Sequence, residues 1–83
     1  PSIIFTPNGD GINDRFVIKN IDAYPQNRLQ VYDRAGRLLY EQNNYSNNWD
    51  GIVNGKPLQK DNYFYVLTVN NKIVKRGTLT LIR

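Results

Sequence analysis

The residues best suited to chemistry lie in one short loop near the start of the sequence. Oxygen-bearing side chains at Asn8, Asp10 and Asp14 are interleaved with Gly9 and Gly11, and glycine lets a backbone fold tightly. A hard cation such as calcium prefers oxygen ligands arranged in this way. We therefore predict a calcium site whose ligands are Asn8, Asp10, the backbone carbonyl of Ile12, Asp14 and, from elsewhere in the chain, Asp50.

The same loop also has a purely structural explanation. It departs from the EF-hand pattern, because Ile12 stands where a side-chain oxygen is expected and the distal glutamate is missing. Asparagine and aspartate side chains commonly bond to their own backbone in Asx-turns. Turn chemistry therefore stays open as the alternative to a metal site.

Enzyme chemistry has few candidate side chains in this sequence. The 83 residues include no histidine and no cysteine, so the usual general base and the thiolate nucleophile are missing. The carboxylates of Asp10, Asp14 and Asp50 have no fixed separation, and so short a chain offers little depth for a substrate cleft. We expect a protein that is not an enzyme.

The charged residues do not indicate a nucleic-acid-binding protein. Eleven lysines and arginines against seven acidic residues give a formal net charge of +4. The basic residues are scattered along the chain, and their longest run is the pair Lys75 and Arg76. A phosphate-binding surface needs a clustered positive patch, so we expect no nucleic acid. No apolar run approaches the roughly 20 residues of a transmembrane helix.

Two-residue alternation and frequent turn signals predict an all-β chain. We expect strands at residues 2–5, 15–18, 28–34, 37–41, 62–69, 72–76 and 78–83. The segment 62–69 has almost no polar residue, which predicts a central strand covered on both faces. Tight turns are expected at Asn54 and Gly55 and at Asn70 and Asn71, and a bulge or bend at Gly77.

These elements predict one domain over residues 1–83, a small immunoglobulin-like or Greek-key β-sandwich of about seven strands. The pattern does not determine the order of the strands. Trp49 is expected in the core, with its indole N–H bonded to a carbonyl. Because the first residue is Pro1 and no signal segment opens the chain, we expect a piece of a larger secreted or surface protein.

Four segments together resemble the gliding motility-associated C-terminal domain family. They are residues 6–14, 31–36, 49–51 and 62–67, in this order and spacing. The likeness covers nearly the whole chain. The sequence departs from the family pattern at Ala35, where a bulky aromatic residue is common, and at residues 59–61, where Pro-Asp-Gly is more usual. These changes leave the expected fold intact but bear on which partner is recognised.

The resemblance implies a type B C-terminal sorting domain of the type IX secretion system. Such a domain directs folded cargo from the periplasm through the outer-membrane translocon, so that the protein is secreted or retained on the cell surface. The implied partners are the secretion machinery and a cognate outer-membrane protein. We expect the domain itself to be a monomer.

We expect the machinery to read the last strand and its neighbouring hairpin, where basic groups gather near the chain end. The predicted contact residues are Lys75, Arg76, Thr78, Leu79, Thr80, Leu81, Ile82 and Arg83. Two other functions remain possible from sequence. One is a glycan-binding or adhesive β-sandwich of a surface adhesin, which predicts a row of exposed aromatic side chains, and the other is a structural spacer.

Overall fold

A computed structural model describes residues 2–7 and 14–82 of the chain, whose regular structure is β-strands apart from one short 3-10 turn. The seven strands are β1 (Ser2–Phe5), β2 (Asn27–Tyr32), β3 (Leu38–Asn43), β4 (Ile52–Val53), β5 (Lys56–Pro57), β6 (Asp61–Val69) and β7 (Lys72–Leu81). The 3-10 turn η1 (Ile21–Ala23) precedes β2. Within these described residues no helix has the length and apolar character needed to cross a membrane.

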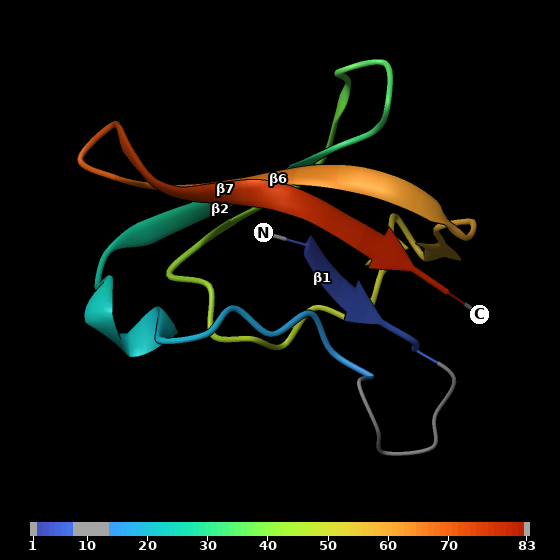
Figure 1. Cartoon of the computed structure of the whole chain (residues 1–83), viewed down its shortest axis with the longest axis horizontal. Coiled ribbons are helices and arrows are strands. Elements are labelled where there is room, and N and C mark those ends of the chain that lie inside the picture. The colour runs from blue at the N-terminus through green and yellow to red at the C-terminus, as the bar shows by residue number, and fades with distance from the viewer. Residues whose placement is uncertain (1, 8–13, 83) are drawn as a thin grey trace.

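Five strands form the main sheet, in the order β1-β7-β6-β2-β3, and β4 and β5 form a separate hairpin. β1 runs parallel to β7, and the other neighbours in the main sheet are antiparallel. After the β2–β3 hairpin, a long connection returns the chain to β6, which lies beside β2. The first and last strands of the domain are therefore neighbours (Figure 1).

The second layer lies opposite the main sheet and consists largely of irregular chain (Figure 1). Two of its segments are tied to each other, because the N–H of Phe16 donates to the carbonyl of Trp49 at 2.9 Å. The N–H of Ile18 donates to the Asn47 side chain, also at 2.9 Å. The predicted small all-β sandwich is confirmed, with one regular layer and one irregular layer.

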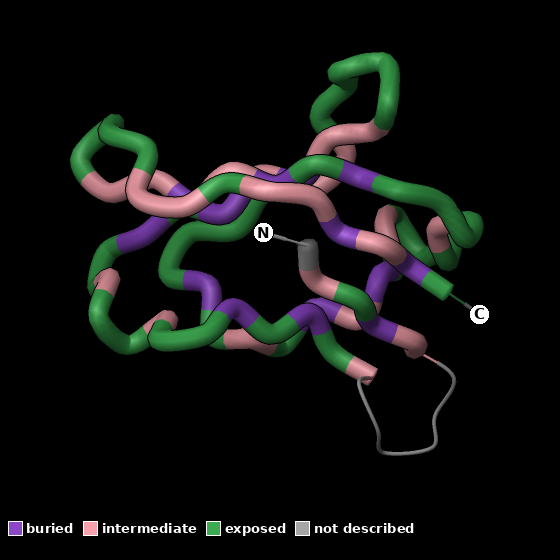
Figure 2. Tube along the Cα trace, in the orientation of Figure 1, coloured by how far each residue is buried: buried purple, intermediate pink, exposed green. Residues whose placement is uncertain are grey.

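The core lies between the two layers and follows the two-residue alternation of the strands (Figure 2). Along β6, for example, Tyr63, Tyr65 and Leu67 are buried while Phe64 is exposed. Full burial of one large apolar side chain stabilises the fold by roughly 1.5–3 kcal/mol. The buried apolar residues are Phe5, Phe16, Ile18, Leu29, Val31, Tyr45, Trp49, Tyr63, Tyr65, Leu67, Leu79 and Leu81.

Both predicted asparagine turns are confirmed. Asn54 and Gly55 have φ of 53° and 78°, and Asn70 and Asn71 have φ of 53° and 63°. Two successive residues with positive φ are typical of the turn that matches the right-handed twist of a hairpin. Asparagine and glycine adopt this conformation more readily than other residues, so they fix the β4–β5 and β6–β7 hairpins.

Three sequence-based expectations about strands are wrong. Residues 15–18 are not a strand, because part of their bonding goes to the Asn47 side chain, although Phe16 and Ile18 share the buried face as expected. β6 is central but covered on one face only, since Phe64 is 44% exposed. Gly77 pairs regularly with Tyr65, and the register instead shifts near the hairpin, between Leu67 and Thr68 of β6.

Candidate recognition surface

Most of the residues predicted to contact a partner lie on β7. Because side chains alternate along a strand, they point to two opposite faces of the sheet. Leu79 and Leu81 point into the core, where they are 0% and 1% exposed. Thr80 lies on the outer face, where its hydroxyl donates to Oδ1 of Asn62 at 2.7 Å. The folded domain therefore offers alternate residues of β7 to a partner. Of the remaining predicted contacts, Ile82 is exposed and Arg83 lies outside the described residues.

The basic residues of β7 keep their charge available. The ion pairs of residues 2–7 and 14–82 join Arg28 to Glu41 at 3.9 Å, Arg34 to Asp61 at 3.5 Å and Arg37 to Asp33 at 2.8 Å. None of them involves Lys75 or Arg76. This strand therefore presents positive charge that no acidic side chain in the described part of the chain offsets.

A shallow apolar hollow of about 430 Å³ lies beside these basic residues. It is lined by Phe64, Tyr65, Val66, Arg76, Gly77 and Thr78. The sequence-based interpretation missed it, because it took both faces of β6 to be covered. The sequence did contain an indication of the hollow. Successive side chains of a strand point to opposite faces, so residues 64 and 66 lie on the face opposite to the tyrosines at 63 and 65.

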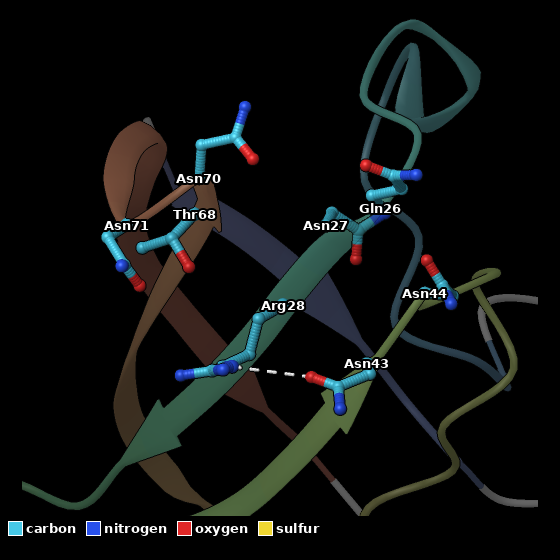
Figure 3. A pocket seen from close by; sticks show the side chains of 8 residues that line it. All are labelled: Gln26, Asn27, Arg28, Asn43, Asn44, Thr68, Asn70 and Asn71. Carbon is cyan, nitrogen blue, oxygen red and sulfur yellow. Dashed lines mark hydrogen bonds between the residues drawn. The ribbon is translucent and has the colours of Figure 1, made fainter.

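A second, polar pocket of about 330 Å³ lies at the far end of the sheet (Figure 3). Its lining residues are Gln26, Asn27, Arg28, Asn43, Asn44, Thr68, Asn70 and Asn71. Half of them have positive φ, between 53° and 63°, at Gln26, Asn44, Asn70 and Asn71. These side chains gather here because three turns need residues that tolerate that backbone conformation. The lining includes no aromatic side chain on which a sugar ring could stack.

The predicted calcium ligands fall into two groups. Asn8, Asp10 and Ile12 lie outside the described residues. Asp14 and Asp50 are described, and Asp50 Oδ1 accepts a hydrogen bond from the N–H of Ile52 at 3.3 Å. Across residues 2–7 and 14–82, no three histidine, cysteine, aspartate or glutamate side chains come together as a metal site. Calcium binding therefore remains a prediction.

The segment 31–36, which carries part of the family resemblance, shapes the turn between β2 and β3. Asp33 Oδ1 accepts the N–H groups of Ala35 and Arg37, each at 2.9 Å, and Oδ2 accepts Nε of Arg37 at 2.8 Å. The backbone hydrogen bond from Arg37 is the main cause that lowers the pKa of Asp33 below its ordinary value. Gly36 supplies a φ of 84°, so the second half of this segment forms the turn after β2.

The segment 49–51 also has a structural role. Trp49 is 4% exposed, its indole Nε1 donates to the carbonyl of Ile52 at 3.2 Å, and both expectations for it are confirmed. Tyr40 stacks on its ring with a centroid distance of 4.5 Å and an interplanar angle of 16°. The Trp ring therefore joins the edge of the main sheet to the irregular layer.

Tyr45 joins the two segments of the irregular layer, which the sequence did not reveal. Its hydroxyl donates to the carbonyl of Phe16 and accepts the N–H of Trp49 at 3.1 Å. Its own N–H donates to Oδ1 of Asn27 at 2.9 Å. Burial raises the pKa of the Tyr45 hydroxyl far above its ordinary value, so it stays protonated and keeps both bonds.

The all-β body carries on β7 positive charge that no described acidic side chain offsets, an arrangement suited to a small recognition module. The comparison with known protein families agrees with this class and identifies the process in which the domain takes part. The model of the CHU_C type IX secretion signal domain matches residues 1–81, so the chain belongs to this family and acts as a sorting signal for type IX secretion. The resemblance seen in the sequence is confirmed. A search of curated proteins and a search of solved structures each gave no match.

Proposed function

We propose that this domain stands at the C-terminal end of a large secreted or surface protein. It directs the folded cargo from the periplasm through the outer-membrane translocon and onto the cell surface. It does so as a monomer without catalysis, by binding the secretion machinery and a cognate outer-membrane protein. The family supports export, and the observation that carries the proposal is the positive charge of β7, whose Lys75 and Arg76 have no acidic partner among the described residues.

The contact surface consists of Lys75, Arg76 and the outward-facing residues after Arg76. Lys75 pairs with Leu67 and so lies on the opposite face of the strand from Arg76, where it is partly exposed. Thr78, Thr80 and Ile82 continue the face of Arg76, and Arg83 follows them in the sequence. Leu79 and Leu81 contribute indirectly, since their burial holds the strand in the sheet. A partner with acidic groups would complement this face, because the described residues leave its charge unpaired.

A reporter protein that carries this domain tests the proposal in a cell with a type IX system. The double variant Lys75→Gln/Arg76→Gln should leave the reporter in the periplasm, because it removes both charges from the surface. The matched control is Lys19→Gln/Lys56→Gln, which removes the same charge at two exposed positions outside the main sheet. Equal export of both variants would overturn the proposed surface.

Deleting residues 78–83 should also trap the reporter, but for a mixture of reasons. The deletion removes the buried side chains of Leu79 and Leu81 as well as the surface. Loss of a single large core side chain costs about 2–5 kcal/mol, so the deleted domain should unfold. Circular dichroism of each variant separates lost folding from lost recognition, and unimpaired export of the deletion would contradict the proposal.

We also propose that the loop 8–14 binds calcium with help from Asp50. The hydrogen bond between Phe16 and Trp49 supports this, because it holds the segments that carry Asp14 and Asp50 against each other. Thermal melting in millimolar calcium and in chelator tests it. A calcium concentration 100 times the Kd would stabilise the fold by about 2.7 kcal/mol.

The matched variants for the calcium test are Asp14→Asn and Asp22→Asn. Asp14→Asn should abolish the shift in melting temperature between calcium and chelator. Asp22→Asn should keep it, because Asp22 lies in η1 and is no part of the loop. An unchanged midpoint in the unaltered domain would leave the loop as turn chemistry alone.

A further inference from the structure

One edge of β7 is only partly paired. β1 pairs with residues 78–81 of β7, whereas β6 pairs along the full length of the other edge. Within residues 2–7 and 14–82, no strand pairs with residues 72–77 on the β1 side. In Figure 1, β1 accordingly lies beside the C-terminal half of β7. An open strand edge presents N–H and C=O groups that a further strand can bind.

The backbone direction at this edge follows from one hydrogen bond. The N–H of Ile82 donates to the carbonyl of Phe5 at 3.1 Å, so Ile82 faces β1. Backbone groups of successive residues in a strand point to alternate sides. Arg76 is an even number of residues before Ile82, so its N–H and C=O point to the same edge of β7 as those of Ile82. β1 does not reach as far as Arg76 along this edge, because it pairs with residues 78–81.

The apolar hollow lies next to the open edge. Phe64 and Val66 of β6 and Arg76 and Thr78 of β7 line it on the outer face. A strand added to β7 would lie about 4.8 Å from it and would place alternate side chains on the same face. One of these side chains can enter the hollow, where Phe64 is 44% exposed and available for contact.

The charge at this edge restricts what can bind there. Lys72, Lys75 and Arg76 all lie along the open segment, and no ion pair of the described chain engages them. Lysine on an edge strand also discourages pairing between copies of the same chain. An acidic strand experiences the opposite effect, because its carboxylates are attracted to the same three cations.

We propose that the secretion machinery recognises this domain by strand addition. An extended segment of the partner pairs with β7 along residues 72–77, places an apolar side chain in the hollow and sets a carboxylate against Arg76. In this mode, main-chain hydrogen bonds give affinity, and pockets for alternate side chains give specificity. The inference rests on the proposed function and specifies how the same surface is read.

A direct test uses a short capped peptide of the repeat Val-Thr-Glu-Thr as the probe, because residues two apart share a face of a strand and this repeat places valine and glutamate on the same face. Its addition to the labelled domain should shift the amide NMR signals of residues 72–78 and of Phe64 and Val66, and should slow hydrogen exchange at Arg76. A peptide of the repeat Val-Thr-Lys-Thr, which differs only in the charge on that face, should give no shift. Shifts elsewhere on the surface, or equal binding of both peptides, would overturn the proposal.

The variant Arg76→Pro removes the N–H that the added strand needs. Proline is tolerated on a strand edge where its nitrogen faces away from the ladder, so β6 pairing should persist. Binding of the acidic peptide should fall by roughly tenfold or more, the loss expected from about 1.4 kcal/mol. Arg76→Gln, which keeps the N–H, should weaken binding by no more than about fivefold. Unchanged binding by a folded Arg76→Pro domain would refute strand addition.

Export of the reporter separates this inference from the proposed function. If the unaltered domain exports the reporter and a folded Arg76→Pro domain exports it equally well, strand addition is wrong and the signal function stands. If the unaltered domain fails to export it, the proposed function itself is wrong. Slow exchange at Arg76 in a longer parent chain without any partner would show that the chain fills its own edge, and would also refute the inference.

Discussion

The two layers around the core are held by different kinds of bonds. In the main sheet, the strands are joined through their backbones along β1, β7, β6, β2 and β3. In the irregular layer, side chains make many of the joins, among them the Tyr45 hydroxyl, the Asn47 amide and the Trp49 indole. Backbone hydrogen bonds between strands persist when most residues are substituted, because nearly every residue type has the same N–H and C=O groups. A hydrogen bond made by a side chain is lost when that side chain is substituted.

This difference bears on where a recognition surface can lie. The outward side chains of β6 and β7 contribute little to holding their strands, so they can be selected for the partner they bind. The side chains of the irregular layer cannot be exchanged so freely, because each one replaces part of a missing ladder. Substitutions of the same type in the two layers should therefore differ in cost.

The largest expected difference is between two phenylalanines. Phe16 in the irregular layer is fully buried, while Phe64 on the outer face of the sheet is 44% exposed. Phe16→Ala should lower the free energy of unfolding by about 3–5 kcal/mol through the cavity it leaves. Phe64→Ala should change it by about 0.5 kcal/mol, as surface substitutions do. Urea denaturation measures both, and equal losses would remove the distinction between the layers.

The next comparison concerns two tyrosine hydroxyls. Tyr45→Phe leaves the carbonyl of Phe16 and the N–H of Trp49 without their partner, and a buried unsatisfied group costs about 1–3 kcal/mol. Tyr32→Phe alters a partly exposed hydroxyl on β2 and should cost less than about 0.5 kcal/mol. Denaturation midpoints of the two variants test this, and a neutral Tyr45→Phe would show that water replaces the hydroxyl.

Alkaline pH gives a smaller and graded effect on the same layer. Burial raises the pKa of Tyr45 above its ordinary value of 10.0, so its contribution to stability is complete below pH 10.0 and declines as the pH rises further. The unaltered domain should therefore lose stability above that pH more steeply than Tyr45→Phe. Melting temperatures of both proteins across this range measure the difference, and parallel curves would contradict it.

The smallest effect is expected at the turn between β2 and β3. Here the Asp33 side chain, in this turn of the main sheet, accepts backbone N–H groups as the side chains of the irregular layer do. The pKa of Asp33 lies below its ordinary value of 3.8, chiefly because of the backbone hydrogen bond from Arg37. Its contribution is thus present above pH 3.8 and is lost as the pH falls through the lowered value. Asp33→Asn should lower the melting temperature slightly at neutral pH and not at strongly acidic pH. A loss that persists in acid would indicate a different cause.

The sequence was informative where local chemistry decides the structure. Alternating residues located β1, β2, β3 and β6 closely, and asparagine turns located two hairpins. The core position of Trp49 also followed from its residue type. These features depend on neighbours in the chain, so a local pattern is enough to predict them.

The sequence was less informative where distant segments decide the structure. The apolar run of β6 suggested two covered faces, because sequence alone does not show that the main sheet has only one layer opposite it. The hydroxyl of Tyr45 bonds across 29 positions to Phe16, and no local pattern marks that contact. For the candidate surface, the basic pair Lys75 and Arg76 was visible, but the hollow and the open edge required the strand order.

The parallel pairing of β1 with β7 has a consequence for synthesis on the ribosome. β1 lies near one end of the sequence, and β7, the strand that pairs with it among residues 2–7 and 14–82, lies near the other. Contacts so distant along the chain form late, because closing a long loop costs entropy. A nascent chain that stops before β7 should remain unfolded and unprotected from protease in a ribosome-stalling assay. A surface carried on β7 would thus exist only once β7 has been synthesised, and chains that stop before it would be withheld from export.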